Sequence, residues 1–189
     1  MTAIIFPGQG SQYVNMSMDF NENFDVARKV FQEIEDSTQI NIRKIITENP
    51  LDNLNQTNYT QISIFSASMA IYKSLLNEFG NEIIKPKFLL GHSLGEYSAL
   101  VAGNYINIKD ASILIKRRGE LMHSSIQPNI SGMAAIIGKN ADFIDDVINK
   151  NNLKIVIAND NSPMQVVVSG LIADINSSEQ VFSENGVKR

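Results

Sequence analysis

The sequence has 189 residues and 43% of them are hydrophobic, so it can bury a core as one domain or one and a half small ones, which argues against disorder. It has no cysteine, which excludes disulfides and thiolate metal sites, and its two histidines without a nearby carboxylate cluster make a zinc site improbable, so we expect no metal. A net charge of −4 without a basic tract disfavours nucleic acid as a partner. The sequence has neither an apolar leader nor a run of about 20 apolar residues, so we expect a cytoplasmic protein with no membrane contact.

The chain opens with a β run at residues 3–6, followed by a loop at residues 7–12 that is rich in turn formers. Apolar spacing predicts helices over residues 24–35 and 42–47, and then a polar, asparagine-rich stretch from 51 to 58. Residues 62–79 read as a long helix whose apolar side chains cover most of its circumference. We interpret this helix as part of the core, with Ile62, Phe65, Ala67, Met69, Ala70, Tyr72, Leu76 and Phe79 as its buried positions.

A nucleophile elbow is predicted at residues 91–95, which read Gly-His-Ser-Leu-Gly between the apolar run 87–90 and a predicted helix over 96–101. The pattern Gly-x-Ser-x-Gly is loose by itself, but the strand, turn and helix that it requires are all present. Ser93 is therefore the candidate nucleophile. The helix start also directs backbone amides, including that of Leu94, toward the place where an oxyanion would form.

An amphipathic helix is predicted over residues 107–126, and Arg118 stands out within it. Its neighbours at three and four residues are all apolar: Leu114, Ile115, Leu121 and Met122. An arginine on a buried stripe is costly unless it binds an anion. The alternative is that its stem packs while the guanidinium reaches water. Arg117 has Glu120 as a surface partner, and Lys116 with Arg117 reads either as a basic patch or, more simply, as a solvated helix face.

A linker is predicted at residues 127–132, and the residues after it have their own order of predicted strands and helices. It reads as strand 133–138, helix 141–150, strand 153–158, strand 165–169 and helix 172–185. This β-α-β-β-α order is that of a ferredoxin-like unit without its last strand. We therefore expect a fragment in which one edge of the first strand is unpaired.

Three separated motifs, at residues 6–12, 91–97 and 118–119, together resemble the malonyl-CoA:acyl carrier protein transacylase family of fatty acid synthesis. The resemblance continues through residues 161–167 and so covers nearly the whole chain. It implies an α/β fold: an incomplete α/β-hydrolase-like parallel-sheet domain in residues 1–128, and an inserted ferredoxin-like subdomain, lacking its last strand, in residues 129–189.

The same resemblance implies a role for each matching residue. Ser93 attacks the thioester of malonyl-CoA and holds the malonyl group as an ester, which the phosphopantetheine thiol of acyl carrier protein then accepts. The backbone amides of Gln9 and Leu94 form the oxyanion hole, and Arg118 binds the malonyl carboxylate. No cofactor is implied, since CoA enters as the thioester substrate.

One departure concerns the general base, which in the family is a histidine beyond the inserted subdomain, and this sequence stops before it. His92 adjoins Ser93 and is read as a residue that shapes the turn, whereas His123 is read as a surface residue near a helix end. A serine without a base stays protonated and weakly nucleophilic. We therefore expect little or no turnover from these 189 residues alone.

Three alternatives stay open. An acyltransferase domain of a polyketide or large fatty acid synthase shares the motifs, although Met1 lies so close to the first strand that a freestanding enzyme is favoured. A serine thioesterase or hydrolase shares the elbow, but the loop at residues 7–10 argues against it. A non-catalytic remnant that binds CoA or carrier protein is the third.

Overall fold

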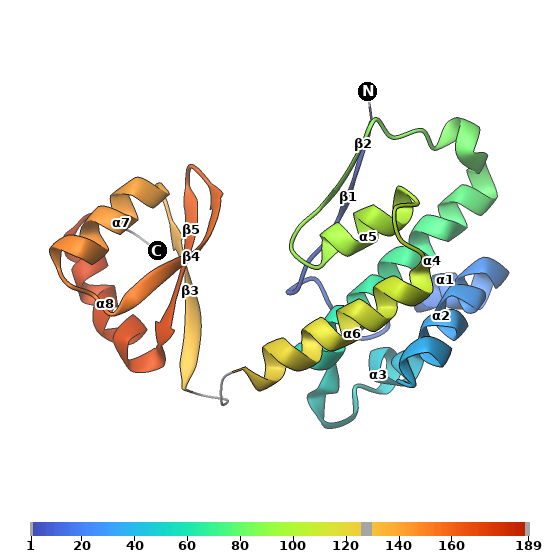
Figure 1. The fold of residues 1–189 in the computed structure, drawn as a ribbon, viewed down its shortest axis with the longest axis horizontal. Helices are drawn as coiled ribbons and strands as arrows, with labels where there is room; N and C mark the ends of the chain where they lie inside the picture. The colour runs from blue at the N-terminus through green and yellow to red at the C-terminus, as the bar shows by residue number, and fades with distance from the viewer. Residues whose placement is uncertain (1, 126–129, 188–189) are drawn as a thin grey trace. The chain divides into compact units, whose positions relative to one another are not determined.

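The computed structural model describes residues 2–125 and 130–187, which form a mixed α/β structure with one parallel and one antiparallel sheet (Figure 1). The chain divides into two units, residues 1–125 and 126–189. The first contains β1 (Ala3–Phe6), α1 (Met18–Asn23), α2 (Asp25–Thr38), α3 (Ile42–Glu48), the 3-10 helix η1 (Pro50–Asn55), α4 (Thr57–Ile83), β2 (Phe88–Gly91), α5 (Gly95–Ala102) and α6 (Ile108–Ser124). The second contains β3 (Ser131–Ile137), α7 (Ala141–Lys150), β4 (Ile155–Ser162), β5 (Gln165–Leu171) and α8 (Ile172–Glu184).

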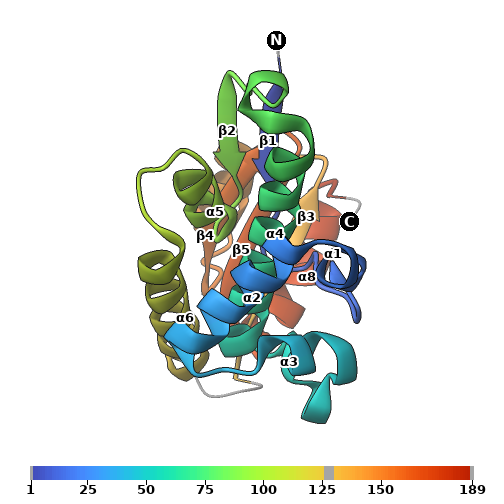
Figure 2. The ribbon, with the colours of Figure 1, turned by 90° about the vertical axis from the view of Figure 1, so that its right-hand side faces the viewer.

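The parallel sheet of the first unit determines where its functional loops meet. β1 pairs with β2 in a register that sets Ala3 against Phe88 and Phe6 against Gly91, and Figure 2 shows the two strands side by side. Parallel strands end at the same edge of a sheet, so the loop after β1 and the predicted elbow after β2 start next to each other. In open α/β sheets this carboxyl edge is where ligands bind.

Helix α4 forms the centre of the first unit and packs against α2, α3, α5 and α6. The predicted long helix is confirmed and begins earlier, at Thr57. Every residue from 60 to 70 is buried, with small serines between the large apolar side chains, so neighbouring helices can approach closely. Phe79 was wrongly predicted to be buried, because 52% of its surface is exposed near the end of the helix.

Two elements were missed from the sequence. Helix α1 has six residues, too few to show a helical repeat. The 3-10 helix η1 contains Leu51 and Asp52 at positive φ, and the side chains of the asparagine-rich stretch stabilise it. The Asn49 side chain accepts a hydrogen bond from the Leu54 amide at 2.8 Å and donates to Asp52 at 3.0 Å. The stretch is therefore an ordered turn that precedes α4.

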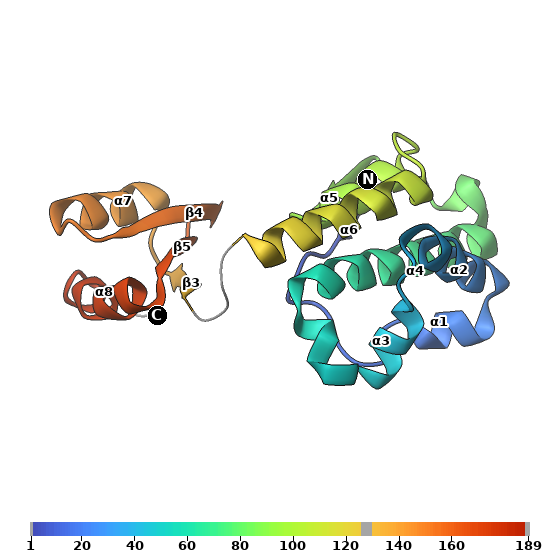
Figure 3. The ribbon, with the colours of Figure 1, turned by 60° about the horizontal axis from the view of Figure 1, so that its bottom comes forward.

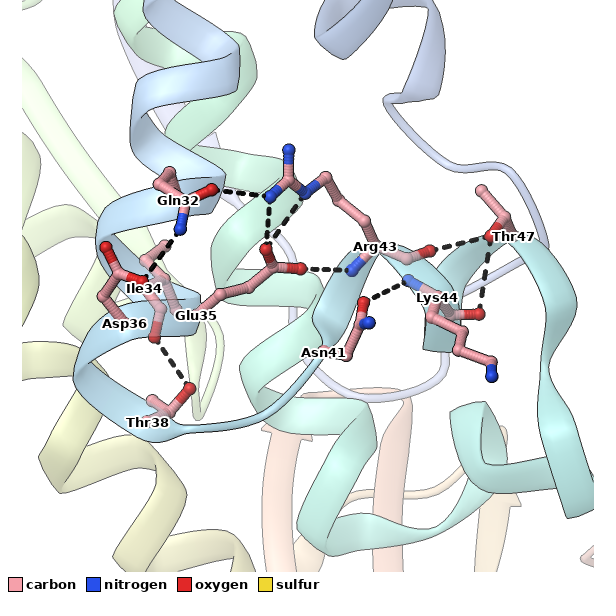
Figure 4. A network of polar contacts seen from close by, with 9 residues as sticks. All are labelled: Gln32, Ile34, Glu35, Asp36, Thr38, Asn41, Arg43, Lys44 and Thr47. Atoms are coloured by element: carbon pink, nitrogen blue, oxygen red, sulfur yellow. Dashed lines mark hydrogen bonds and ion pairs between the residues drawn. The ribbon is translucent and has the colours of Figure 1, made fainter.

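A polar network joins α3 to α2 (Figure 4). The Glu35 carboxylate accepts hydrogen bonds from the Arg43 backbone amide at 2.9 Å and from its Nε at 3.0 Å. Arg43 also donates to Gln32 Oε1 at 2.9 Å. At the start of α3, Asn41 caps the helix by accepting from the Lys44 amide at 3.1 Å. These bonds link α3 to α2.

The second unit has the predicted β-α-β-β-α order, with an antiparallel sheet ordered β3-β5-β4. Inward positions alternate along its strands, as Val166 and Val168 do on β5, and they form a separate core with side chains of α7 and α8. Within the described residues, β3 pairs with β5 alone, so its other edge has no strand partner, as expected. β3 begins at Ser131, earlier than predicted; the rest of the predicted linker lies largely in residues 126–129, outside the described residues.

Across the described ranges, no helix combines the length and the apolar character needed to span a bilayer.

Candidate active site

Ser93 occupies a sharp turn between β2 and α5. Its φ is 53°, in the left-handed region that serine rarely adopts and that holds backbone strain. A Cβ on Gly91 would lie 2.0 Å from the Gly95 carbonyl carbon, so this position accepts only glycine. The chain therefore turns as a nucleophile elbow requires, and the serine side chain is exposed at the end of the sheet.

The loop after β1 packs directly against this turn. A Cβ on Gly8 would lie 2.6 Å from the His92 carbonyl oxygen and 2.9 Å from its Nδ1. The His92 amide in turn donates to the Phe6 carbonyl at 3.2 Å. His92 thus contacts the neighbouring loop with both backbone and ring, which agrees with its interpretation as a residue that shapes the turn.

The two residues expected to supply oxyanion donors lie at the two sides of this contact. Gln9 is exposed in the loop after β1, and its side-chain amide donates to Thr57 Oγ1 at 3.3 Å. Leu94 immediately precedes α5, and its side chain is 1% exposed. The next amides are used within the turn, since Gly95 N donates to the His92 carbonyl at 2.9 Å. A buried leucine anchors the start of the helix and holds the backbone beside Ser93 in place.

Arg118 reaches the elbow from α6. Its Nη2 donates a hydrogen bond to Ser93 Oγ at 2.9 Å. The expectation that Arg118 lies on a buried stripe was wrong, because the residue is only half-buried. Of its four apolar neighbours only Ile115 is buried; the exposed fractions are 50% for Leu114, 51% for Leu121 and 47% for Met122. Arg118 therefore lies at the margin of the core, where a charged ligand can approach it from solvent.

Gln61 of α4 holds the other side of the guanidinium and was missed from the sequence. Its side chain is 1% exposed, and its Oε1 accepts a hydrogen bond from Arg118 Nη1. Its Nε2 donates to Met122 Sδ at 3.2 Å. The signal that could have indicated it is a glutamine immediately before the mostly apolar helix predicted over residues 62–79. Its partner could not be read from the sequence, because 57 residues separate the two.

The other polar residues singled out from the sequence lie apart from this contact. His123 is exposed in the last turn of α6. Arg117 pairs with Glu120 at 3.4 Å on the surface, as expected. Lys116 donates to the Thr38 carbonyl at 2.8 Å, so its ammonium binds the end of α2. Within residues 2–125 and 130–187 no three His, Cys, Asp or Glu side chains gather in a way that could hold a metal ion.

The geometry combines a strained serine at a strand-to-helix turn with a cation hydrogen-bonded to its hydroxyl. A comparison with known proteins agrees with this geometry, because residues 3–188 match the acyl transferase domain family. The chain belongs to this family. It is 35% identical to the malonyl CoA-acyl carrier protein transacylase of Bacillus subtilis over 191 residues, covering 99% of the chain and 59% of that relative.

Solved acyl transferase structures resemble the whole chain. The acyl-carrier-protein-S-malonyltransferase of Bartonella henselae superposes with a TM-score of 0.90 at 35% identity, covering 100% of this chain and 61% of that one. A malonyl-transacylase in complex with its type II PKS acyl-carrier protein superposes with a TM-score of 0.89 at 33% identity, covering 100% and 60%. The chain thus spans about three fifths of the length of these acyl transferases.

Proposed function

We propose that this chain carries the acyl-accepting serine of a transferase that moves a malonyl group from malonyl-CoA to acyl carrier protein. The observation that carries the proposal is the hydrogen bond of 2.9 Å from Arg118 to Ser93 Oγ. A cation at this distance from a nucleophile suits an acyl group whose far end is a carboxylate. The relatives named for malonyl transfer, one of them in complex with an acyl-carrier protein, support the same substrate and partner.

In the first half-reaction Ser93 Oγ forms a bond to the thioester carbon while the bond from that carbon to the CoA sulfur breaks. The hydroxyl proton passes through a base and ends on the CoA thiol. Charge develops on the carbonyl oxygen, and the amides of Gln9 and Leu94 are its proposed donors. In the second half-reaction the carrier's phosphopantetheine sulfur forms a bond to the ester carbon while the bond from that carbon to Ser93 Oγ breaks. The thiol proton passes through the base to Ser93 Oγ.

Arg118 is the proposed selectivity residue. Its planar guanidinium can donate two parallel hydrogen bonds to a carboxylate, whereas an acetyl group offers it no acceptor at that end. Gln61 is buried and its Oε1 already accepts a hydrogen bond from Nη1, so the guanidinium is oriented before the substrate arrives. A malonyl carboxylate would take the place of Ser93 Oγ on Nη2, which also frees the hydroxyl for attack.

The finer fold description belongs to the same proposal. We place residues 1–128 in an α/β-hydrolase-like domain, supported by a serine elbow after a parallel strand. We place residues 129–189 in a ferredoxin-like subdomain, supported by its β-α-β-β-α order and by the sheet order β3-β5-β4. The two units at residues 1–125 and 126–189 are compatible with this division.

The 189 residues alone are proposed to turn over little or not at all. Serine needs a base, and the two histidines of this sequence lie elsewhere: His92 contacts Gly8 and His123 is on the surface. A single acylation of Ser93 requires only the first half-reaction, whereas turnover requires both. The acylated serine can be detected as a stable ester.

The test is intact-mass spectrometry of the folded chain after exposure to malonyl-CoA or acetyl-CoA. We expect a malonyl adduct that is absent from Ser93→Ala, and a malonyl-to-acetyl ratio that falls at least about tenfold in Arg118→Ala. An adduct that persists in Ser93→Ala would contradict the role of Ser93, whereas a folded chain without an adduct would mean that acylation itself needs a base from outside these residues. An unchanged ratio in Arg118→Ala would contradict the role of the arginine.

Transfer is separated from hydrolysis in a second step. The acylated chain is freed of CoA and divided between buffer and a phosphopantetheinylated acyl carrier protein. Faster loss of the malonyl group to the carrier supports a transferase. Equal loss in both samples, with free malonate as the product, would identify a hydrolase instead.

A further inference from the structure

The first two turns of α4 contact both the loop after β1 and helix α6, which contribute to the proposed site. Thr57 accepts a hydrogen bond from the Gln9 side chain at 3.3 Å, and Gln61, one turn later, binds Arg118. The loop after β1 and helix α6 therefore both reach the same short segment, which lies at the start of the helix that forms the centre of the unit.

Helix α6 can reach this turn because of a glycine. A Cβ on Gly119 would lie 3.0 Å from Asn58 Cα, 3.1 Å from the Thr57 carbonyl oxygen and 3.3 Å from the Asn58 carbonyl oxygen. All three atoms belong to the backbone of α4, so no flexible side chain can move aside. Figure 3 shows α6 running alongside α4 where the two helices pack.

We propose that Gly119 is a positioning residue, which lets α6 approach the first turn of α4 closely enough for Arg118 to contact Gln61 and Ser93 together. Carbon atoms normally meet at about 3.5–4.0 Å, so a methyl group at residue 119 would require α6 and α4 to separate by a few tenths of an ångström. A shift of α6 away from α4 separates Arg118 from Gln61, so the guanidinium loses the anchor that orients it toward Ser93. Binding geometries must be held within about 0.5 Å to work.

The inference depends on the proposed function only for its consequence, which is malonyl selectivity. The position of Arg118 is a structural claim, and it can be measured without any acyl transfer. The two readouts therefore separate a failure of this inference from a failure of the proposed function.

The experiment compares Gly119→Ala with the parent chain by NMR of the arginine side chains, with the Arg118 signals assigned by their loss in Arg118→Lys. A guanidinium held on two sides rotates slowly and gives separate Nη signals. In Gly119→Ala we expect these signals to shift and merge, and the malonyl-to-acetyl adduct ratio to fall roughly tenfold. Ile108→Val, which trims a buried side chain near the start of α6, is the control for a destabilised helix α6 and should leave both readouts unchanged.

Arg118 signals that stay as in the parent would overturn the inference, whatever the acylation result. Shifted signals together with an unchanged adduct ratio would overturn its link to selectivity. If Gly119→Ala fails to fold, Gln61→Met tests the same dependence on α4, because it removes the anchor at nearly constant volume. Unchanged Arg118 signals in that variant would reject Gln61 of α4 as the anchor on which the proposed positioning depends.

Discussion

Gly95 and Phe6 touch through backbone alone: a Cβ on Gly95 would lie 2.3 Å from the Phe6 carbonyl oxygen. The start of α5 is therefore pressed against the end of β1, and this contact connects the serine turn to the neighbouring strand. We expect Gly95→Ala to lower the free energy of unfolding by about 3 kcal/mol or more, because backbone atoms cannot repack around the added methyl group.

Urea denaturation of the variant measures this loss, with Gly103→Ala at the other end of α5 as the control. There the added Cβ would meet the ring of Tyr105 at 3.0 Å, and this side chain is 84% exposed and free to move. A similar loss in both variants would show that the contact between Gly95 and Phe6 contributes no more to the free energy of unfolding than the contact at Gly103.

The positive φ of Ser93, 53°, predicts that the site is strained. Replacement by glycine removes the clash of Cβ, which costs about 1–3 kcal/mol, at an entropic cost of about 0.5–1 kcal/mol. Ser93→Gly should therefore raise the free energy of unfolding by about 1 kcal/mol. Ser93→Ala is the matched control, since it loses the same hydroxyl but keeps Cβ. If thermal unfolding finds the glycine variant no more stable than the alanine variant, the turn holds no strain.

Lys116 should stabilise the end of α2, because its Nζ donates to the Thr38 carbonyl at 2.8 Å. Helix C-termini have carbonyl groups without partners and favour positive charge. We expect Lys116→Met to lower the free energy of unfolding by about 1 kcal/mol in chemical denaturation. Lys109→Met, an exposed lysine on the same helix, should change it by less than half as much. Equal effects would contradict the proposed cap.

The Glu35 and Arg43 pair should matter more than the surface pairs. The exposed fractions of the two side chains are 33% for Arg43 and 12% for Glu35, and the carboxylate also accepts from a backbone amide at 2.9 Å. We expect Glu35→Gln to cost about 1–2 kcal/mol. Glu48→Gln breaks an exposed pair with Lys44 at 3.8 Å and should cost less than about 0.5 kcal/mol. Guanidinium denaturation at constant salt compares the two, and a reversed order would refute the argument.

Much of the fold was readable because its signals are local. The strand, turn and helix around residue 93 were predicted from contiguous residues, and so were α4, α6 and the β-α-β-β-α order of the second unit. Short or irregular elements were not. Helix α1 has too few turns to show a period, and η1 depends on hydrogen bonds between side chains of an asparagine-rich stretch that give no periodic pattern.

The sequence by itself determined which residues carry the chemistry to be tested, Ser93 and Arg118, and it determined the turn that holds the serine. Glycine spacing and apolar periodicity encode such features within a few adjacent residues. Only the tertiary structure decided that Arg118 lies at a half-exposed margin, bonded to Ser93 and to a buried Gln61. These contacts join residues 25 and 57 positions apart, and they depend on how closely α6 crosses α4, a distance that no local pattern records.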